Sequence, residues 1–282
     1  MKKILILAIA AIIPLAVAAQ EAITPKEIYT KKVKIADFTE KVTKIVLTGR
    51  DFFDLSLQGE VEDTWKISPY EFCTWEEFET LKSDDSYYFL ITTKDRFKRE
   101  SAPGVQFITL LKGGEGADKG IEEMLEVVSM PIASAEEPSG REFIFLPALL
   151  DIIQEHAAKA IESDIAGYAG LTNHTDNIQR SKGMKIVFAQ TDLSSQVKDT
   201  MFDKDMVITD EEEADGFMDD KTKNMLVSFV VAPTGKTIGS YCYKMLIDAE
   251  THELYYFRRH RISRKDGVGF LAEDMKKIAS HR

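Results

Sequence analysis

Cysteine and histidine are scarce in this chain, and both shortages exclude classes of protein. Only Cys73 and Cys242 occur among 282 residues, which excludes a scaffold built on several disulfides. Cys242 lies in an apolar stretch typical of a buried strand, so we expect two separate buried thiols, with a bridge between them as the alternative. The 5 histidines show neither a His-x-x-x-His nor a His-Glu-x-x-His spacing, so no metal site is predicted.

Motifs for nucleotide binding and nucleophilic catalysis are also lacking. The stretch VVAPTGKTIGSYCY, residues 230–243, contains a Thr-Gly-Lys-Thr that resembles the end of a P-loop. A P-loop needs a glycine where this chain has Val230, and a helix where it has the strand-like Tyr241-Cys242-Tyr243. We expect a hairpin loop over 233–239, no nucleotide and no cofactor. No Gly-x-Ser-x-Gly is present, and no catalytic residue is predicted.

Long apolar runs are confined to the beginning of the chain. Lys2 and Lys3 precede an apolar stretch and the small residues of 17–19, which predicts a signal peptide over 1–19. We therefore expect an exported protein, periplasmic or secreted. Because no cysteine follows the stretch, it is not expected to be a lipoprotein. No other run approaches the roughly 20 residues of a membrane span, so no stable membrane insertion is expected after cleavage.

Basic side chains are in deficit, with 36 against 47 acidic ones and a formal net charge of −11. Such a surface repels phosphate backbones and anionic headgroups, so nucleic acid is not an expected partner.

What the sequence does contain is an internal repeat. KIVLTGRD at 44–51 is echoed by KIVFAQTD at 185–192, a shift of 141 positions that gives 8 identities over 44–93. The order of predicted elements repeats as well. It predicts an α/β fold of two duplicated αβ units, each a mixed sheet flanked by helices. The units are placed at 44–170 and 171–282, after an N-terminal segment at 20–43.

Hydrophobic periodicity and turn signals predict the individual elements. In the first copy, a helix over 51–63 is expected to bury Phe52, Leu55 and Val61, and a second helix is expected to begin at Ser68-Pro69-Tyr70-Glu71. Three strands follow at 87–93, 105–112 and 126–133, with a helix at 146–164. In the second copy we expect helices at 192–202, from Thr209-Asp210, and at 271–281, with strands at 226–232, 240–248 and 253–262.

One basic strand stands out in this acidic chain. Arg258, Arg259 and Arg261 follow Tyr256, and strand alternation puts Arg259 and Arg261 on one face. Aromatic and arginine side chains are enriched at interface hot spots, so all four residues are predicted to bind an acidic partner. The alternative is that Glu273 and Asp274 of the closing helix pair with these arginines.

The repeated order of strands and helices resembles the α/β units of periplasmic proteins of the TolB N-terminal and CsgG-like type. Those proteins are assembly or scaffold components of Gram-negative envelopes. The resemblance implies a non-enzymatic exported protein that acts through contacts with an envelope protein partner. The alternatives are a hydrolase with a scattered active site, and a module that binds a small ligand or glycan at the seam between the two repeats.

Overall fold

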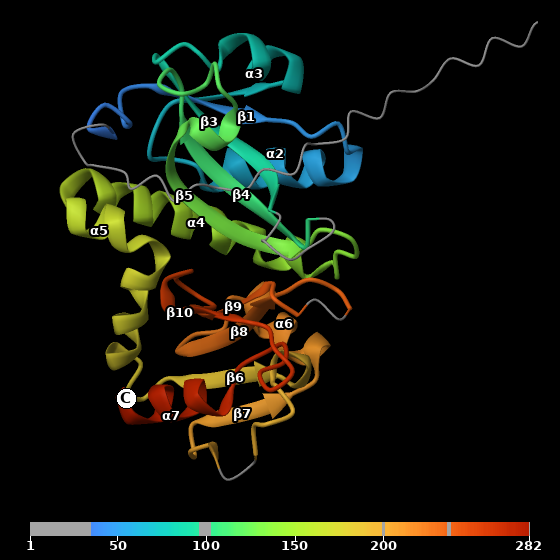
Figure 1. Ribbon diagram of the computed structural model, residues 1–282. Coiled ribbons are helices and arrows are strands. Elements are labelled where there is room, and N and C mark those ends of the chain that lie inside the picture. Colours follow the sequence, from blue (N-terminus) through green and yellow to red (C-terminus); the bar gives the residue numbers. More distant parts are fainter. Residues whose placement is uncertain (1–34, 96–102, 199–200, 236–237, 282) are drawn as a thin grey trace, which may run out of the picture.

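The computed structural model describes residues 35–95, 103–198, 201–235 and 238–281, and the expected signal peptide lies outside these ranges. Two five-stranded sheets stand one above the other (Figure 1). Sheet A has the strand order β2-β1-β3-β4-β5 and sheet B the order β7-β6-β8-β9-β10. We call the part of the chain that carries sheet A unit 1, and the part that carries sheet B unit 2.

The elements of unit 1 come first in the chain: β1 (Val42–Val46), α2 (Asp51–Thr64), β2 (Tyr70–Cys73), α3 (Trp75–Leu81), β3 (Tyr87–Asp95), β4 (Val105–Lys112), η1 (Ile121–Glu123), β5 (Leu125–Ser134) and α4 (Arg141–Glu162). The first three strands are parallel, and β4 and β5 continue the sheet antiparallel. Ile35 and Phe38, which precede β1, are also buried in this unit.

After α5 (Asp164–Ala169) and the 3-10 helix η2 (Gly170–Arg180), unit 2 follows: β6 (Lys185–Ala189), η3 (Gln190–Asp192), β7 (Met206–Thr209), α6 (Glu211–Asp219), β8 (Met225–Val231), β9 (Tyr241–Asp248), β10 (Leu254–Arg261) and α7 (Ala272–His281). Strands β6, β7 and β8 are parallel, and the remaining pairs are antiparallel. The two sheets therefore have the same topology, which confirms the predicted α/β fold of two similar units.

The sequences of the two units cannot be aligned without a gap. Ile45 pairs with Leu90, and its counterpart Ile186 pairs with Leu226, so the offset between the third strands is 136 rather than 141. The constant shift therefore holds for the first strand only. The later identities at that shift compare positions that are not equivalent.

The gap arises because no α-helix corresponding to α2 occurs among the described residues between β6 and β7, so the helix predicted over 192–202 is wrong for residues 192–198. After η3, the chain instead forms an isolated bridge between Leu193 and Phe270. The amide of Phe270 donates to Asp192 at 2.7 Å and that of Ser194 to Phe270 at 3.0 Å. These bonds hold the segment extended at a point where a helix would need its own i to i−4 bonds.

The helix start predicted at Ser68 is also wrong, because β2 occupies the following residues. Ser68 is buried and its hydroxyl bonds Thr43 at 2.7 Å and Trp65 Nε1 at 3.1 Å, so it cannot cap a helix. The helix cap lies six residues later, where Thr74 and Glu77 form a capping box.

Helix α2 forms where predicted, but it buries a different face. Phe52 and Leu55 are 71% and 68% exposed, whereas Phe53, Leu57 and Val61 are buried. The predicted long helix also starts earlier than expected, at Arg141 instead of residue 146. The other predicted strands, the Thr209-Asp210 helix start and the closing helix are confirmed within a residue or two.

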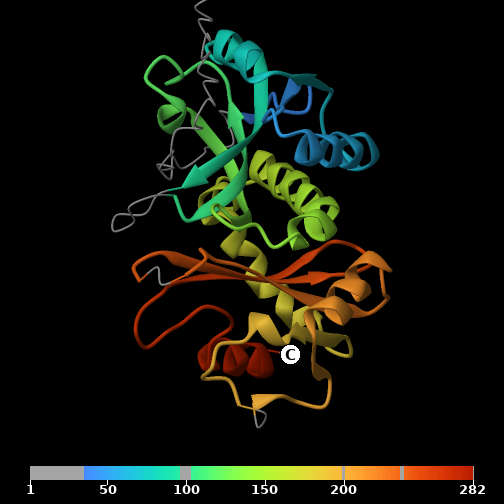
Figure 2. The ribbon, with the colours of Figure 1, turned by 90° about the vertical axis from the view of Figure 1, so that its right-hand side faces the viewer.

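Helix α4 lies between the two sheets, as both ribbon views show (Figures 1 and 2). Its Phe145 stacks on Phe229 of β8 with ring centroids 4.3 Å apart, and one hydrophobic core spans both units. Ile45 belongs to this shared core, but its counterpart Ile186 packs on the outer side, against α7. The units are therefore stacked in the same sense, with equivalent faces pointing the same way.

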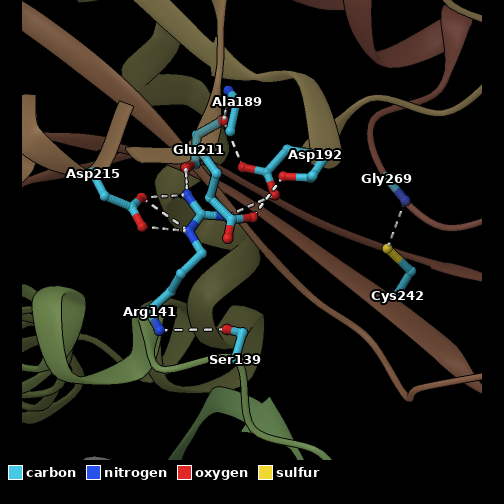
Figure 3. Close-up of polar contacts among 10 residues, drawn as sticks. Ser139, Arg141, Ala189, Asp192, Glu211, Asp215, Cys242 and Gly269 are labelled. Carbon is cyan, nitrogen blue, oxygen red and sulfur yellow. Dashed lines mark hydrogen bonds and ion pairs between the residues drawn. The ribbon is translucent and has the colours of Figure 1, made fainter. Parts of the chain in front are cut away.

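A buried arginine ties the units together at the start of α4 (Figure 3). Arg141 is 5% exposed; its guanidinium donates to Asp215 on α6 and to Asp192 after β6, each at 2.9 Å. Arg141 Nη2 also donates to the carbonyl of Ser228, at 3.1 Å. A buried cation needs such partners, so this cluster fixes how unit 1 sits on unit 2.

Candidate functional site

The topology of sheet A points to one place for a ligand. In parallel sheets, ligands bind outside the carboxyl ends of the strands, where neighbouring connections leave in opposite directions. In unit 1 this point lies between β1 and β3, since β2 and β3 flank β1. A cavity of about 490 Å³ opens there, which we call the crevice; its lining residues are Arg50, Phe52, Phe53, Gln106, Ala133, Pro138, Ser139, Gly140, Glu142 and Phe143.

The loop after β1 is held by a carboxylate from the helix that follows it. Asp54 accepts hydrogen bonds from the amides of Thr48 and Gly49 and from the Thr48 hydroxyl, each at 2.8 Å. Helix α2 then begins at Arg50 without a side-chain cap. Its first backbone N–H groups therefore face the crevice end of the sheet with no capping oxygen.

Arg50 brings a cation to the crevice. Its Nε donates to the Thr48 hydroxyl at 3.3 Å, and its Nη1 lies 3.5 Å from Oε1 of the buried Gln106. The guanidinium also stacks over the ring of Phe53, 4.8 Å from the centroid. Partial burial lowers the pKa of Arg50, and the carboxylates of Asp54 and Glu142 partly offset this, so the group stays charged.

The start of α4 forms the opposite wall. Gly140 has a φ of 94°, in the left-handed region that glycine tolerates, and gives the helix no side-chain cap. Glu142 turns back and accepts the amide of Gly140 at 2.8 Å. Glu142 is 5% exposed, and this hydrogen bond fixes its carboxylate in the lining of the cavity.

Phenyl rings supply the apolar part of the lining. Phe52 and Phe143 meet edge to face with centroids 4.9 Å apart. Phe53 is buried behind them, whereas most of Phe52 is in solvent. An aromatic side chain left this exposed beside a cavity is a common feature of binding sites.

The matching place in unit 2 is filled. Phe270, fully buried, bridges to Leu193 across the end of the sheet. Lys244 and Asp274, both fully buried, pair at 2.5 Å under it. Side chains of unit 2 itself therefore occupy the volume that is open in unit 1.

The predicted partner-binding residues fall on β10, in two different environments. Tyr256 is fully buried and donates to Asp274 at 2.6 Å. Arg258 pairs with Asp274 at 3.1 Å and with Glu273 at 3.5 Å, as the alternative expectation had it. These two side chains thus belong to the packing of α7.

Arg259 and Arg261 are exposed, on the face that strand alternation predicted. Both guanidinium groups lie over Tyr241, at 5.1 and 5.9 Å from its centroid, and Arg261 also donates to the carbonyl of Gly239. The first half of the edge strand is covered by η2, where Thr175 and Asn177 donate to the carbonyls of Phe257 and Leu254. Only the arginine end of β10 extends past this cover.

The remaining sequence predictions concern loops and thiols. The strands β8 and β9 on either side of 233–239 pair antiparallel, as the predicted hairpin requires, and Lys236 and Thr237 lie outside the described residues. Cys73 and Cys242 are both buried and free. No cluster of three or more metal-ligating side chains occurs among the described residues, and none of their helices is long and apolar enough to span a membrane.

Sequence reasoning did not find the crevice. The signal that was available is positional: Arg50 follows a predicted parallel strand and opens a helix, which is where α/β sheets bind ligands.

Comparisons with known proteins leave the site to be interpreted from its geometry, because no family model, no curated protein and no solved structure matches this chain.

Proposed function

We propose that this chain is an exported, non-enzymatic binding protein and that the crevice of unit 1 holds its ligand, a small molecule. One observation carries the proposal. Two units of the same topology differ at the same place, which is filled by Phe270 in unit 2 and open in unit 1. Protein interiors close-pack by default, so an open volume with ordered polar and aromatic walls supports a binding role.

The lining favours binding over hydrolysis. It offers a guanidinium, an amide and a carboxylate, which can hold a polar ligand in one orientation. Ser139 is the one hydroxyl side chain of the lining, and no histidine or cysteine of the described residues joins it. The nucleophile and base that a hydrolase brings together are thus not placed side by side here.

A blocking substitution tests the site. Ser139→Trp would place an indole in the crevice, while Glu136→Trp puts the same side chain on the same loop outside the lining. Small metabolites that bind the wild type by ligand-observed NMR should bind Glu136→Trp equally and lose binding to Ser139→Trp. Binding that survives the block would contradict the proposal.

Docking of an acidic envelope partner at β10 is the second candidate, favoured by the exposure of Arg259 and Arg261 at the uncovered end of the edge strand. Reversing both charges to glutamate should abolish co-purification of that partner with the fold intact. Arg264→Glu is the control. Unchanged co-purification would remove this candidate.

A further inference from the structure

Two side chains of opposite charge line the crevice without pairing to each other. Arg50 and Glu142 influence each other electrostatically, yet no ion pair joins them among the described residues. Arg50 is instead held by Thr48 and Gln106, and Glu142 is held by the amide of Gly140. A ligand placed between them would meet a cation on one side and a carboxylate on the other.

Arg50 is arranged to receive a carboxylate. The Thr48 hydroxyl accepts from Nε, Gln106 accepts from Nη1, and the Phe53 ring covers one face of the guanidinium. The Nη2 donors have no hydrogen-bond partner among the described residues. The free N–H groups of Nη2 can donate to a carboxylate, and the uncapped start of α2 adds a favourable dipole.

Glu142 is arranged to receive an ammonium group. Its Oε2 accepts the Gly140 amide, which fixes the carboxylate, and Oε1 has no hydrogen-bond partner among the described residues. The rings of Phe52 and Phe143 stand beside it in the lining, and phenyl faces also attract a cation. Asp54 does not compete for the ligand's ammonium group, because its oxygens already accept three hydrogen bonds from the β1–α2 loop.

A ligand that carried one charge only would leave the opposite protein charge uncompensated as the crevice lost water. A zwitterion satisfies both. The exposed Phe52 ring and the cavity volume of about 490 Å³ leave room for an apolar side chain beside the charged groups. We infer that the ligand is a free α-amino acid with an apolar or aromatic side chain, its carboxylate on Arg50 and its ammonium group on Glu142. This inference rests on the proposed function of the crevice.

Calorimetric titration with L-phenylalanine and three analogues tests the ligand class. N-acetyl-L-phenylalanine lacks the ammonium, L-phenylalaninamide lacks the carboxylate, and glycine lacks the apolar body. We expect L-phenylalanine to bind and each analogue to bind at least about 10-fold more weakly, the loss typical of one missing charged contact. An analogue that binds as well as L-phenylalanine would overturn the class, as would tighter binding of a short-chain phosphatidylethanolamine.

Paired variants separate the two charges. Glu142→Gln keeps the bond to Gly140 and should weaken L-phenylalanine binding at least about 10-fold while leaving N-acetyl-L-phenylalanine unchanged. Arg50→Met should have the complementary effect, with L-phenylalaninamide unchanged. Glu137→Gln and Arg264→Met, outside the lining, serve as controls.

These experiments distinguish failure of the zwitterion inference from failure of the proposed function of the crevice. If a ligand that Ser139→Trp blocks binds equally to Glu142→Gln and Arg50→Met, the crevice is a site but the zwitterion is wrong. If no small molecule binds at the crevice, both fail.

Discussion

The two units place corresponding residues at the carboxyl ends of their parallel strands and use them differently. Strand pairing makes Gln106 of β4 the counterpart of Lys244 of β9. In unit 1, Gln106 lines an open crevice. In unit 2, Lys244 is buried and paired with Asp274. Asp192 there accepts hydrogen bonds from the amide of Phe270 and from the guanidinium of Arg141.

Asp192 holds the corresponding place in unit 2 closed. Its backbone carbonyl accepts Phe270, and its carboxylate accepts Arg141 and Ser228. The first bond closes the end of sheet B and the second binds the start of α4 from unit 1. The comparison teaches that the same end of the same sheet topology can be closed by contacts within the unit, as in unit 2, or left open, as in unit 1.

The largest expected effect comes from removing Arg141, the cation buried between Asp192 and Asp215. Arg141→Met should destabilise the protein by about 3–5 kcal/mol, because Asp192 and Asp215 would remain buried without the cation that neutralises them. Urea unfolding measures this loss. Adding Asp192→Asn and Asp215→Asn should recover a large part of it. A single variant as stable as the wild type would show that the cluster does not hold the seam.

Acid should lower the free energy of unfolding through two buried histidines between α4 and η2. His156 of α4 lies beside His174 of η2, with ring centroids 5.8 Å apart. Burial lowers the pKa of His156 to about 3 and that of His174 to about 4, and repulsion by Lys159 adds to both. The unfolded chain takes up these protons near pH 6.5 and the folded chain does not. Stability is therefore full above pH 6.5 and falls as the pH is lowered toward 4.

The size of this acid effect follows from the same shifts. Each histidine should cost on the order of 2 kcal/mol between pH 6.5 and 5. Asp192 acts in the opposite direction, since burial raises its pKa to about 6 and protonation then favours the folded state. Urea midpoints at pH 7 and 5 should show the net loss, and replacing both histidines with leucine should abolish it. An unchanged pH dependence in that variant would contradict the assignment.

A glycine permits the close contact between Phe270 and Leu193 that closes the end of sheet B. Gly269 has a φ of 99°, and a Cβ there would lie 2.6 Å from the carbonyl oxygen of Asp192. Gly183 has a φ of 87° with open space around it, which makes it a matched control. Gly183→Ala should cost about 1 kcal/mol, and Gly269→Ala about 2 kcal/mol or more, because the strand-like contact with Leu193 must shift as well. Equal costs would mean that this contact is not tight.

Substitutions in the crevice of unit 1 should lower ligand affinity and leave stability unchanged. Phe52→Ser removes an exposed ring, so the free energy of unfolding should change by less than about 0.5 kcal/mol while ligand affinity falls. Leu55→Ser, on the same exposed face of α2 but outside the lining, should change neither. A stability loss at Phe52 would show that this ring belongs to the core.

The sequence predicted the inner strands well because they are apolar runs buried on both faces, as in β4, β8 and β9, whereas the edge strand β2 is short and partly exposed. Its failures have physical causes. Leu193, Val197 and Met201 have helical spacing, and they do pack against the outer core, but from an irregular segment held by Phe270. Periodicity therefore identified the buried side chains and not the backbone that carries them.

The crevice was beyond sequence reasoning for a different reason. Its walls come from α2, β4 and the start of α4, and no local pattern reports that these distant segments meet. Phe52 also fitted the pattern of an inward-facing helical residue as well as Phe53 did, and only tertiary packing decides between them.

Amide chemical-shift mapping tests the contrast between the two crevices most directly. The isotope-labelled protein would be titrated in turn with L-phenylalanine, 3-phenylpropanoate and phenethylamine. We predict that L-phenylalanine shifts the amides of Phe52, Gln106 and Phe143 and leaves those of Leu193, Lys244 and Phe270 in place. Shifts centred on the second group, or no shift with any of the three compounds, would contradict the account of one open and one closed crevice.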